Sequence, residues 1–68
     1  MKEIDARGLA CPEPVLLVMN ELKKNEFPLC VLVSEPHQKD NVIKLAANRG
    51  LQVRAQVNGS EFEVYIDK

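Results

Sequence analysis

The dipeptide Asn58-Gly59 constrains the fold of this chain more than any other feature of the sequence. It lies between two runs, "LQVRAQV" (residues 51–57) and "SEFEVYI" (residues 60–66), in which apolar and polar residues largely alternate. A period of two is typical of β-strands, and Asn-Gly favours the tight turn of a two-residue hairpin. We therefore expect an antiparallel hairpin with Asn58 and Gly59 as its central turn residues.

This turn predicts the register of the two strands. Three apolar pairs then face each other on one side of the hairpin: Leu51 with Ile66, Val53 with Val64, and Ala55 with Phe62. On the other side, which suits contact with solvent, Arg54 lies opposite Glu63 as an attractive cross-strand pair. We expect this register because a shift by one residue would mix apolar with polar positions.

The first half of the chain indicates two strands joined by a helix. "KEIDA" (residues 2–6) is typical of a short strand, and "LCVLVS" (residues 29–34) is a nearly continuous apolar run, typical of a strand in the middle of a sheet. Between them, a helix starting at Pro12 would place one set of apolar residues on one face: Val15, Leu16, Val18, Met19 and Leu22.

A second helix is expected between the apolar run and the hairpin. "EPHQKD" (residues 35–40) is polar and contains a proline, which indicates a loop. Asp40 is then the expected N-cap of the helix, and Gly50 lies where a glycine commonly ends one. His37, the one histidine of the chain, is expected to be a solvated loop residue.

Together these elements predict the order βαβαββ in a single domain, residues 1–68. The fold class is α+β: a two-layer α/β sandwich with a four-stranded mixed sheet and two helices on one face. The chain is 46% apolar and 28% charged, which is typical of a globular protein, and its net charge of −1 gives no reason to expect a direct nucleic-acid partner. With no apolar run that could span a bilayer and no signal peptide, we expect a cytoplasmic monomer without a membrane partner.

Cys11 stands at the start of the first predicted helix, between a glycine-containing loop and two prolines, Pro12 and Pro14. Prolines are tolerated in a first turn, where they stiffen the segment and leave the N–H groups of Glu13 and Val15 as nearby donors. Those donors and the helix dipole favour a thiolate. With a reference pKa of about 8.5, only ~3% of a thiol is ionised at pH 7, and lowering the pKa by roughly one unit gives about 25%.

Two interpretations of Cys11 remain open from the residues alone: a reactive thiol, or a small residue that only caps a helix. A Cys–His dyad is disfavoured because His37 belongs to a different segment, and two separated cysteines with one histidine make a poor metal site. We expect neither a metal nor a cofactor. Cys30 lies within the apolar run and is expected to pack in the core. Arg7 could attract a thiolate or an acidic partner, or could pair with Asp5 or Glu3.

The segment "DARGLACPEPV" (residues 5–15) closely resembles the signature of the TusA/SirA-like family of small sulfur-carrier proteins, in which Arg-Gly-Leu is followed by Cys-Pro-x-Pro. The similarity extends over nearly the whole chain, and "DNVIKLAANRGLQV" (residues 40–53) is most similar to the YedF-type branch. The resemblance implies that Cys11 carries a transferable persulfide. It also implies that six residues shape the site: Asp5, Arg7, Gly8, Leu9, Pro12 and Pro14.

The resemblance further implies a sulfur relay with two protein partners. A donor such as a cysteine desulfurase would load Cys11, and a downstream acceptor protein would take the sulfur, as in transfer-RNA thiolation or in sulfur or selenium metabolism. The chain would then be a sulfurtransferase-type carrier with a cysteine persulfide intermediate. The alternative is a non-catalytic interaction or regulatory module that keeps the fold without transfer. Replacement of Cys11 by serine separates the two, because only a carrier needs the sulfur.

Overall fold

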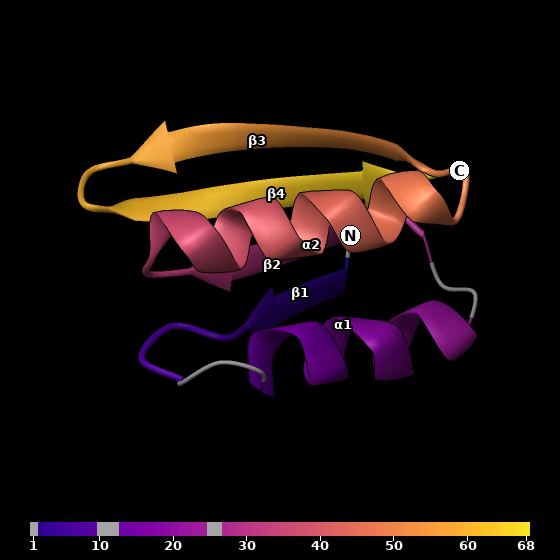
Figure 1. Cartoon of the computed structure of the whole chain (residues 1–68), viewed down its shortest axis with the longest axis horizontal. Coiled ribbons are helices and arrows are strands. Elements are labelled where there is room, and N and C mark those ends of the chain that lie inside the picture. The colour runs from indigo at the N-terminus through magenta and orange to yellow at the C-terminus, as the bar shows by residue number, and fades with distance from the viewer. Residues whose placement is uncertain (1, 10–12, 25–26) are drawn as a thin grey trace.

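Six secondary-structure elements lie within residues 2–9, 13–24 and 27–68, which are the residues that the computed structural model describes (Figure 1). In chain order they are β1 (Lys2–Asp5), α1 (Glu13–Lys23), β2 (Leu29–Val33), α2 (Pro36–Asn48), β3 (Gln52–Asn58) and β4 (Glu61–Asp67). The predicted order βαβαββ is confirmed.

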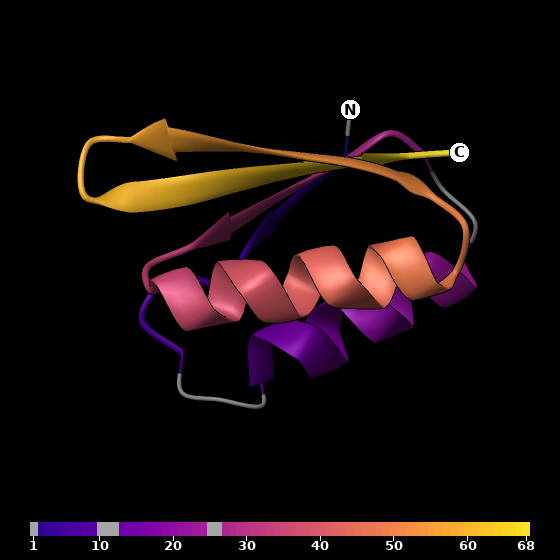
Figure 2. The same ribbon diagram turned by 45° about the horizontal axis from the view of Figure 1, so that its top comes forward.

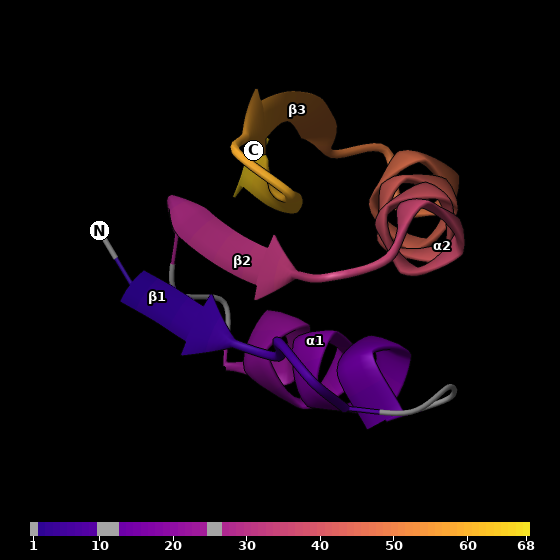
Figure 3. The ribbon, with the colours of Figure 1, turned by 90° about the vertical axis from the view of Figure 1, so that its left-hand side faces the viewer.

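The four strands form one mixed sheet in the order β1-β2-β4-β3. β2 runs parallel to β1 and antiparallel to β4, and β4 runs antiparallel to β3. Both helices lie side by side on one face of this sheet (Figure 2, Figure 3). The predicted two-layer α+β sandwich is therefore confirmed, and the central place of β2 explains why its sequence is almost continuously apolar.

The core lies between the helices and the sheet. Its buried apolar side chains come from every element except β3, together with Ala6: Ile4, Ala6, Val18, Leu22, Leu29, Val31, Val33, Val42, Ala46, Val64 and Ile66. Leu16 was expected on the apolar face of α1, but its side chain is 51% exposed and is not part of the core. The buried stripe of α1 is therefore narrower than the apolar pattern predicts. In the described part of the chain, neither helix is long and apolar enough to cross a membrane.

No described element covers the other face of the sheet, which we call the open face. Because successive side chains of a strand point to opposite faces, it carries the residues that alternate with the core positions. Glu3, Cys30 and Tyr65 lie on it side by side, since Cys30 pairs with Glu3 of β1 and with Tyr65 of β4. The open face is therefore mainly polar, with one cysteine near its middle.

Helix α2 begins five residues earlier than predicted. Glu35 is its N-cap and Pro36 occupies the first helical position, so residues 35–40 are not a loop and Asp40 lies within the helix. The proline is the reason: its fixed φ suits the first helical turn, where its missing N–H costs nothing. His37 stays exposed in this first turn, as expected of a solvated residue, whereas Gln38 is buried.

The end of α2 is where the sequence predicts it. Gly50 has a φ of +74°, a conformation that favours glycine, directly after the C-cap residue Arg49. The N–H of Gly50 donates to the carbonyl of Ala47 at 3.0 Å, and the N–H of Leu51 donates to that of Ala46 at 3.1 Å. These two bonds form a Schellman motif, which satisfies carbonyls that the helix end would otherwise leave free.

The hairpin forms, but its register differs from the prediction. Asn58 pairs with Glu61, so Gly59 and Ser60 are the central turn residues, and Gly59 has a φ of +65°. Each residue of β3 consequently faces a residue of β4 two positions beyond the expected one. The same residues still share a face, because strand faces repeat every two residues. Arg54 accordingly lies opposite Tyr65 rather than Glu63, with its guanidinium carbon 5.2 Å from the ring centroid.

Candidate functional site

The loop that follows β1 leads towards Cys11 and is fixed at three points. Ala6 donates its N–H to the carbonyl of Leu32 at 2.9 Å, which continues the pairing of β1 with β2. Gly8 has a φ of +77° and donates its N–H to Oγ of Ser34 at 3.0 Å. Leu9 then accepts a hydrogen bond on its carbonyl from α2. The expected site residues Gly8 and Leu9 are thus held against the end of β2 and the start of α2.

Arg7 lies in an ion-pair cluster with two carboxylates. Its guanidinium donates to both oxygens of Asp5 at 2.9 Å, and its Nη1 donates to Glu61 Oε1 at 3.1 Å. The backbone N–H of Arg7 also donates to Asp5 at 3.2 Å. The sequence leaves open whether Arg7 attracts a thiolate or an acidic partner, or pairs with Asp5 or Glu3. In the structure it pairs with Asp5. Arg7 thereby joins the end of β1 to the start of β4.

This cluster shifts the titration of both partners. The side-chain hydrogen bonds from Arg7, and then the bond from its backbone N–H, lower the pKa of the Asp5 carboxyl to about 2. The bonds from Asp5 and Glu61 in turn raise the pKa of Arg7. Both side chains are substantially exposed, so salt screens their attraction.

Asp5→Asn should remove a contribution to folding stability that wild type has at neutral pH and loses in acid. The folded-state pKa of Asp5 is depressed, so its contribution is fully present above the unfolded value of about 3.9 and is lost as the pH falls towards 2. We expect wild type to be more stable than Asp5→Asn at pH 7, with the gap closing between about pH 4 and pH 2. Urea unfolding at a series of pH values measures this gap.

The matched control is Asp40→Asn, because the Asp40 carboxylate pairs with Lys39 at 3.6 Å rather than with a bidentate arginine. A stability gap between wild type and Asp5→Asn that stays constant from pH 7 to pH 2 would contradict the role given to this ion pair.

Gln38 is a contact of the loop that the sequence does not reveal. It belongs to the first turn of α2, is 3% exposed, and donates a hydrogen bond from Nε2 to the carbonyl of Leu9. Its Oε1 is buried and has no hydrogen-bond partner among the described residues. Sequence reasoning missed Gln38 because residues 35–40 were expected to form a loop. Recognising Pro36 as a first-turn proline would have placed Gln38 in a helix.

Cys11 and Pro12, the centre of the predicted site, lie outside the described residues. Glu13 is the first residue of α1 and is exposed, in the first turn where a negative charge suits the helix dipole. Pro14 follows it as the second residue of the helix. In sequence, Cys11 therefore lies two residues after the anchored Leu9 and two residues before the start of α1.

Cys30 is buried as expected, at 5% exposure, but it lies on the open face rather than in the core between the layers. Burial raises the pKa of its thiol, and the carboxylates of Glu63 and Glu3 raise it further. The thiol therefore stays protonated at neutral pH. A protonated and buried thiol is a poor nucleophile.

In the Cys11→Ser protein, where Cys30 is the remaining thiol, alkylation by iodoacetamide should be slow. We expect the rate at pH 8 to be at least about tenfold lower in the folded protein than in 6 M guanidinium chloride. Intact-mass spectrometry follows the reaction. Equal rates in the two conditions would show that the sheet does not protect Cys30.

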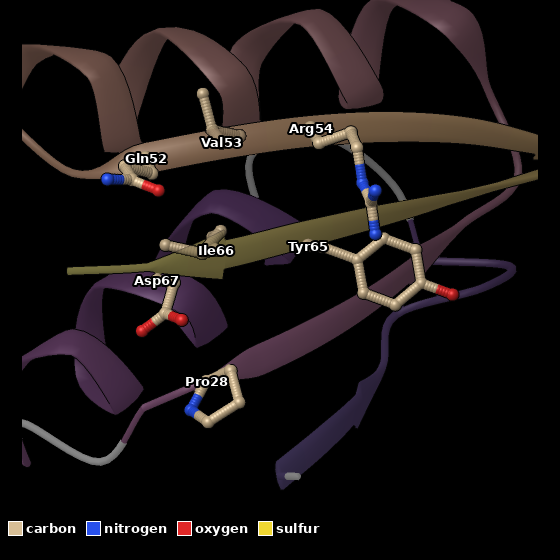
Figure 4. A pocket seen from close by; sticks show the side chains of 7 residues that line it. All are labelled: Pro28, Gln52, Val53, Arg54, Tyr65, Ile66 and Asp67. Atoms are coloured by element: carbon tan, nitrogen blue, oxygen red, sulfur yellow. The ribbon is translucent and has the colours of Figure 1, made fainter.

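An open hollow of about 400 Å³ lies at the opposite end of the sheet from the loop (Figure 4). Pro28, the start of β3 and the end of β4 line it, with Arg54 and Tyr65 on its polar side. The loop after β1 adjoins the end of β2 and the start of β4 instead. The hollow therefore contains none of the predicted site residues.

Comparisons with known proteins agree with this arrangement. The family model for sulfurtransferase TusA matches residues 2–68. The crystal structure of a SirA-like protein from Desulfitobacterium hafniense is 30% identical in sequence and superposes with a TM-score of 0.91, covering 98% of this chain and 96% of that one. Among curated proteins, none matches the sequence.

Proposed function

Because the chain belongs to the sulfurtransferase TusA family, we propose that it is a small sulfur carrier that accepts persulfide sulfur on Cys11 and relays it to an acceptor protein. Family membership accounts for a sulfur-transfer role, and the Cys-Pro-x-Pro segment points to the atom involved. Cys11 is the cysteine of that segment, whereas Cys30 is a buried thiol with a raised pKa.

The observation that carries the proposal is the anchoring of the loop that leads to Cys11. Within four residues of the cysteine, Arg7 is tied to β4, Gly8 to the residue that follows β2, and Leu9 to α2. The helix that follows begins two residues after it. The N–H groups of a first helical turn favour the anionic form of a nearby thiol, which suits a sulfur carrier.

The proposed transfer needs no oxidant and no cofactor on this chain. The Cys11 thiolate attacks the outer sulfur of a persulfide on the donor. A new S–S bond forms on Cys11 while the S–S bond of the donor breaks, and the electron pair leaves on the donor's thiolate. In delivery, the acceptor attacks the outer sulfur carried on Cys11. The S–S bond on Cys11 breaks, and its electron pair stays on the Cys11 thiolate. The groups that stabilise the thiolate also stabilise the persulfide anion carried between the two steps.

The partners follow from this chemistry. A cysteine desulfurase, or another protein that forms a persulfide, supplies the sulfur, and a downstream protein that needs activated sulfur consumes it. The similarity of residues 40–53 to the YedF-type branch supports a relay in sulfur or selenium metabolism, and transfer-RNA thiolation is the other destination that the family resemblance implies.

Intact-mass spectrometry tests the proposal. The protein is incubated with a cysteine desulfurase, cysteine and pyridoxal phosphate, and we expect a gain of one sulfur atom that a reductant removes. Fragmentation of the loaded protein should locate the added sulfur on Cys11. The same mixture without cysteine is the control. No gain from a desulfurase that is active on cysteine, or a gain located on Cys30, would contradict the proposal.

A further inference from the structure

We propose that Gln38 is a positioning residue for the sulfur-carrying segment, acting through its hydrogen bond to the carbonyl of Leu9. The inference deepens the proposed function and rests on it for the role of Cys11. It adds a residue from α2, far from the Cys-Pro-x-Pro segment in the sequence, to the groups on which the reactivity of that segment depends.

The burial of Gln38 requires an explanation. Glutamine is mostly exposed in folded proteins, and burying an amide is unfavourable unless its hydrogen bonds are replaced. Gln38 is nevertheless 3% exposed on the same helix as the buried Val42 and Ala46. An apolar side chain would suit such surroundings better. The contact that an apolar side chain could not make is the hydrogen bond from Nε2 to Leu9.

The hydrogen bond from Gln38 reaches the chain only two residues before Cys11, where it can affect the position of that residue. Leu9 is the last described residue before the segment 10–12, so its carbonyl is the last described anchor of the loop before Cys11. The preceding anchors hold Ala6 and Gly8 against β2 and its following residue, Ser34. Gln38 is the anchor that comes from the helical layer, and it therefore relates the loop to the layer that contains α1.

Small displacements of a nucleophile matter for group transfer. The sulfur must meet the donor's outer sulfur along a defined line, and its anion is stabilised only if first-turn N–H groups point towards it. Loss of the Gln38 bond frees the carbonyl of Leu9 and loosens this geometry. The expected consequence is a less acidic and slower Cys11 thiol in a protein that is still folded.

Gln38→Met tests the proposal, since methionine has nearly the same length and cannot donate. Iodoacetamide alkylation of Cys11 is followed by mass spectrometry from pH 5 to pH 9, well below the unfolding temperature. We expect the rate at pH 7 to fall by about three- to eightfold and the midpoint of the pH profile to rise. Gln56→Met, an exposed glutamine on β3, is the matched control and should leave the profile unchanged.

Gln38→Glu provides a second variant if the methionine protein does not fold. It keeps the shape of the side chain and loses the donor once it is ionised, so the profile should shift in the same direction at neutral pH. A folded variant at position 38 whose alkylation profile superposes on that of wild type would overturn the proposal, whatever its unfolding temperature. A merely structural role predicts that result.

The alkylation assay needs no desulfurase, so the two proposals can fail separately. If wild type does not take up sulfur but Gln38→Met still alters Cys11, the carrier function is wrong and the positioning role stands. If wild type takes up sulfur and Gln38→Met alkylates like wild type, the carrier function stands and the positioning role is wrong.

Discussion

Cys11→Ser should abolish the uptake of sulfur from a desulfurase, with no detectable gain in mass where wild type gains one sulfur atom. The hydroxyl is scarcely ionised at neutral pH and cannot form a persulfide, so the loss should be complete rather than partial. Intact-mass spectrometry over a time course with cysteine and a desulfurase measures it. Wild type and Cys11→Ser should also differ in onward transfer, since only wild type holds sulfur to deliver.

The same substitution should leave the fold unchanged. Serine and cysteine are similar in size, and serine is favoured at the start of a helix. We expect the free energy of unfolding to change by less than about 1 kcal/mol. Cys30→Ala is the matched control, because it removes the other thiol and should load sulfur like wild type. Full loading of Cys11→Ser would contradict the assignment of the carrier site to Cys11 and would mean that the site is elsewhere in the chain.

The second large effect is a loss of stability, and it is expected from a substitution at the centre of the sheet. Leu29 is fully buried at the start of β2, between Lys2 of β1 and Ile66 of β4. Leu29→Ala removes three buried carbon atoms and leaves a cavity, which costs about 2–5 kcal/mol. A chain of this length is stabilised by about 3–10 kcal/mol in total, so the variant should melt roughly 10 °C or more below wild type. Thermal unfolding followed by circular dichroism checks this.

Leu16→Ala is the control for this prediction. It removes the same atoms from an apolar side chain that is 51% exposed on α1. Its effect on the free energy of unfolding should stay within about 0.5 kcal/mol. Equal losses from Leu29→Ala and Leu16→Ala would contradict the placement of the core between β2 and the helices.

The element order and the two-layer architecture could be predicted because they depend on local periodicity. The alternation around Asn58 and the helical spacing around Val18 are visible within short windows of the sequence. The hairpin register could not be predicted in the same way. A register displaced by two residues keeps every side chain on its own face, so alternation cannot distinguish Val53 opposite Val64 from Val53 opposite Ile66.

The site was predicted only in part, for two physical reasons. A proline in a polar segment indicates a loop, but prolines also begin helices, and the sequence does not distinguish the two at Pro36. The buried position of Gln38 depends on that helix start. Glu61 and Ser34 meet the loop only because the sheet order places β2 between β1 and β4, and no local pattern contains that order. The roles of the motif residues themselves stay a prediction that the resemblance to a family implies.

The sheet order also leaves β1 at an edge, where a strand of another copy could add to the sheet. β1 is an edge strand of four residues, and three of them, Lys2, Glu3 and Asp5, are charged. Short and charged edges are poor templates for the addition of a strand from another chain. The backbone of β1, just before the loop that leads to Cys11, is thus protected against aggregation by its own side chains. If the proposed carrier meets its partners at that end of the molecule, the charged edge lowers the risk that they join into a continuous sheet.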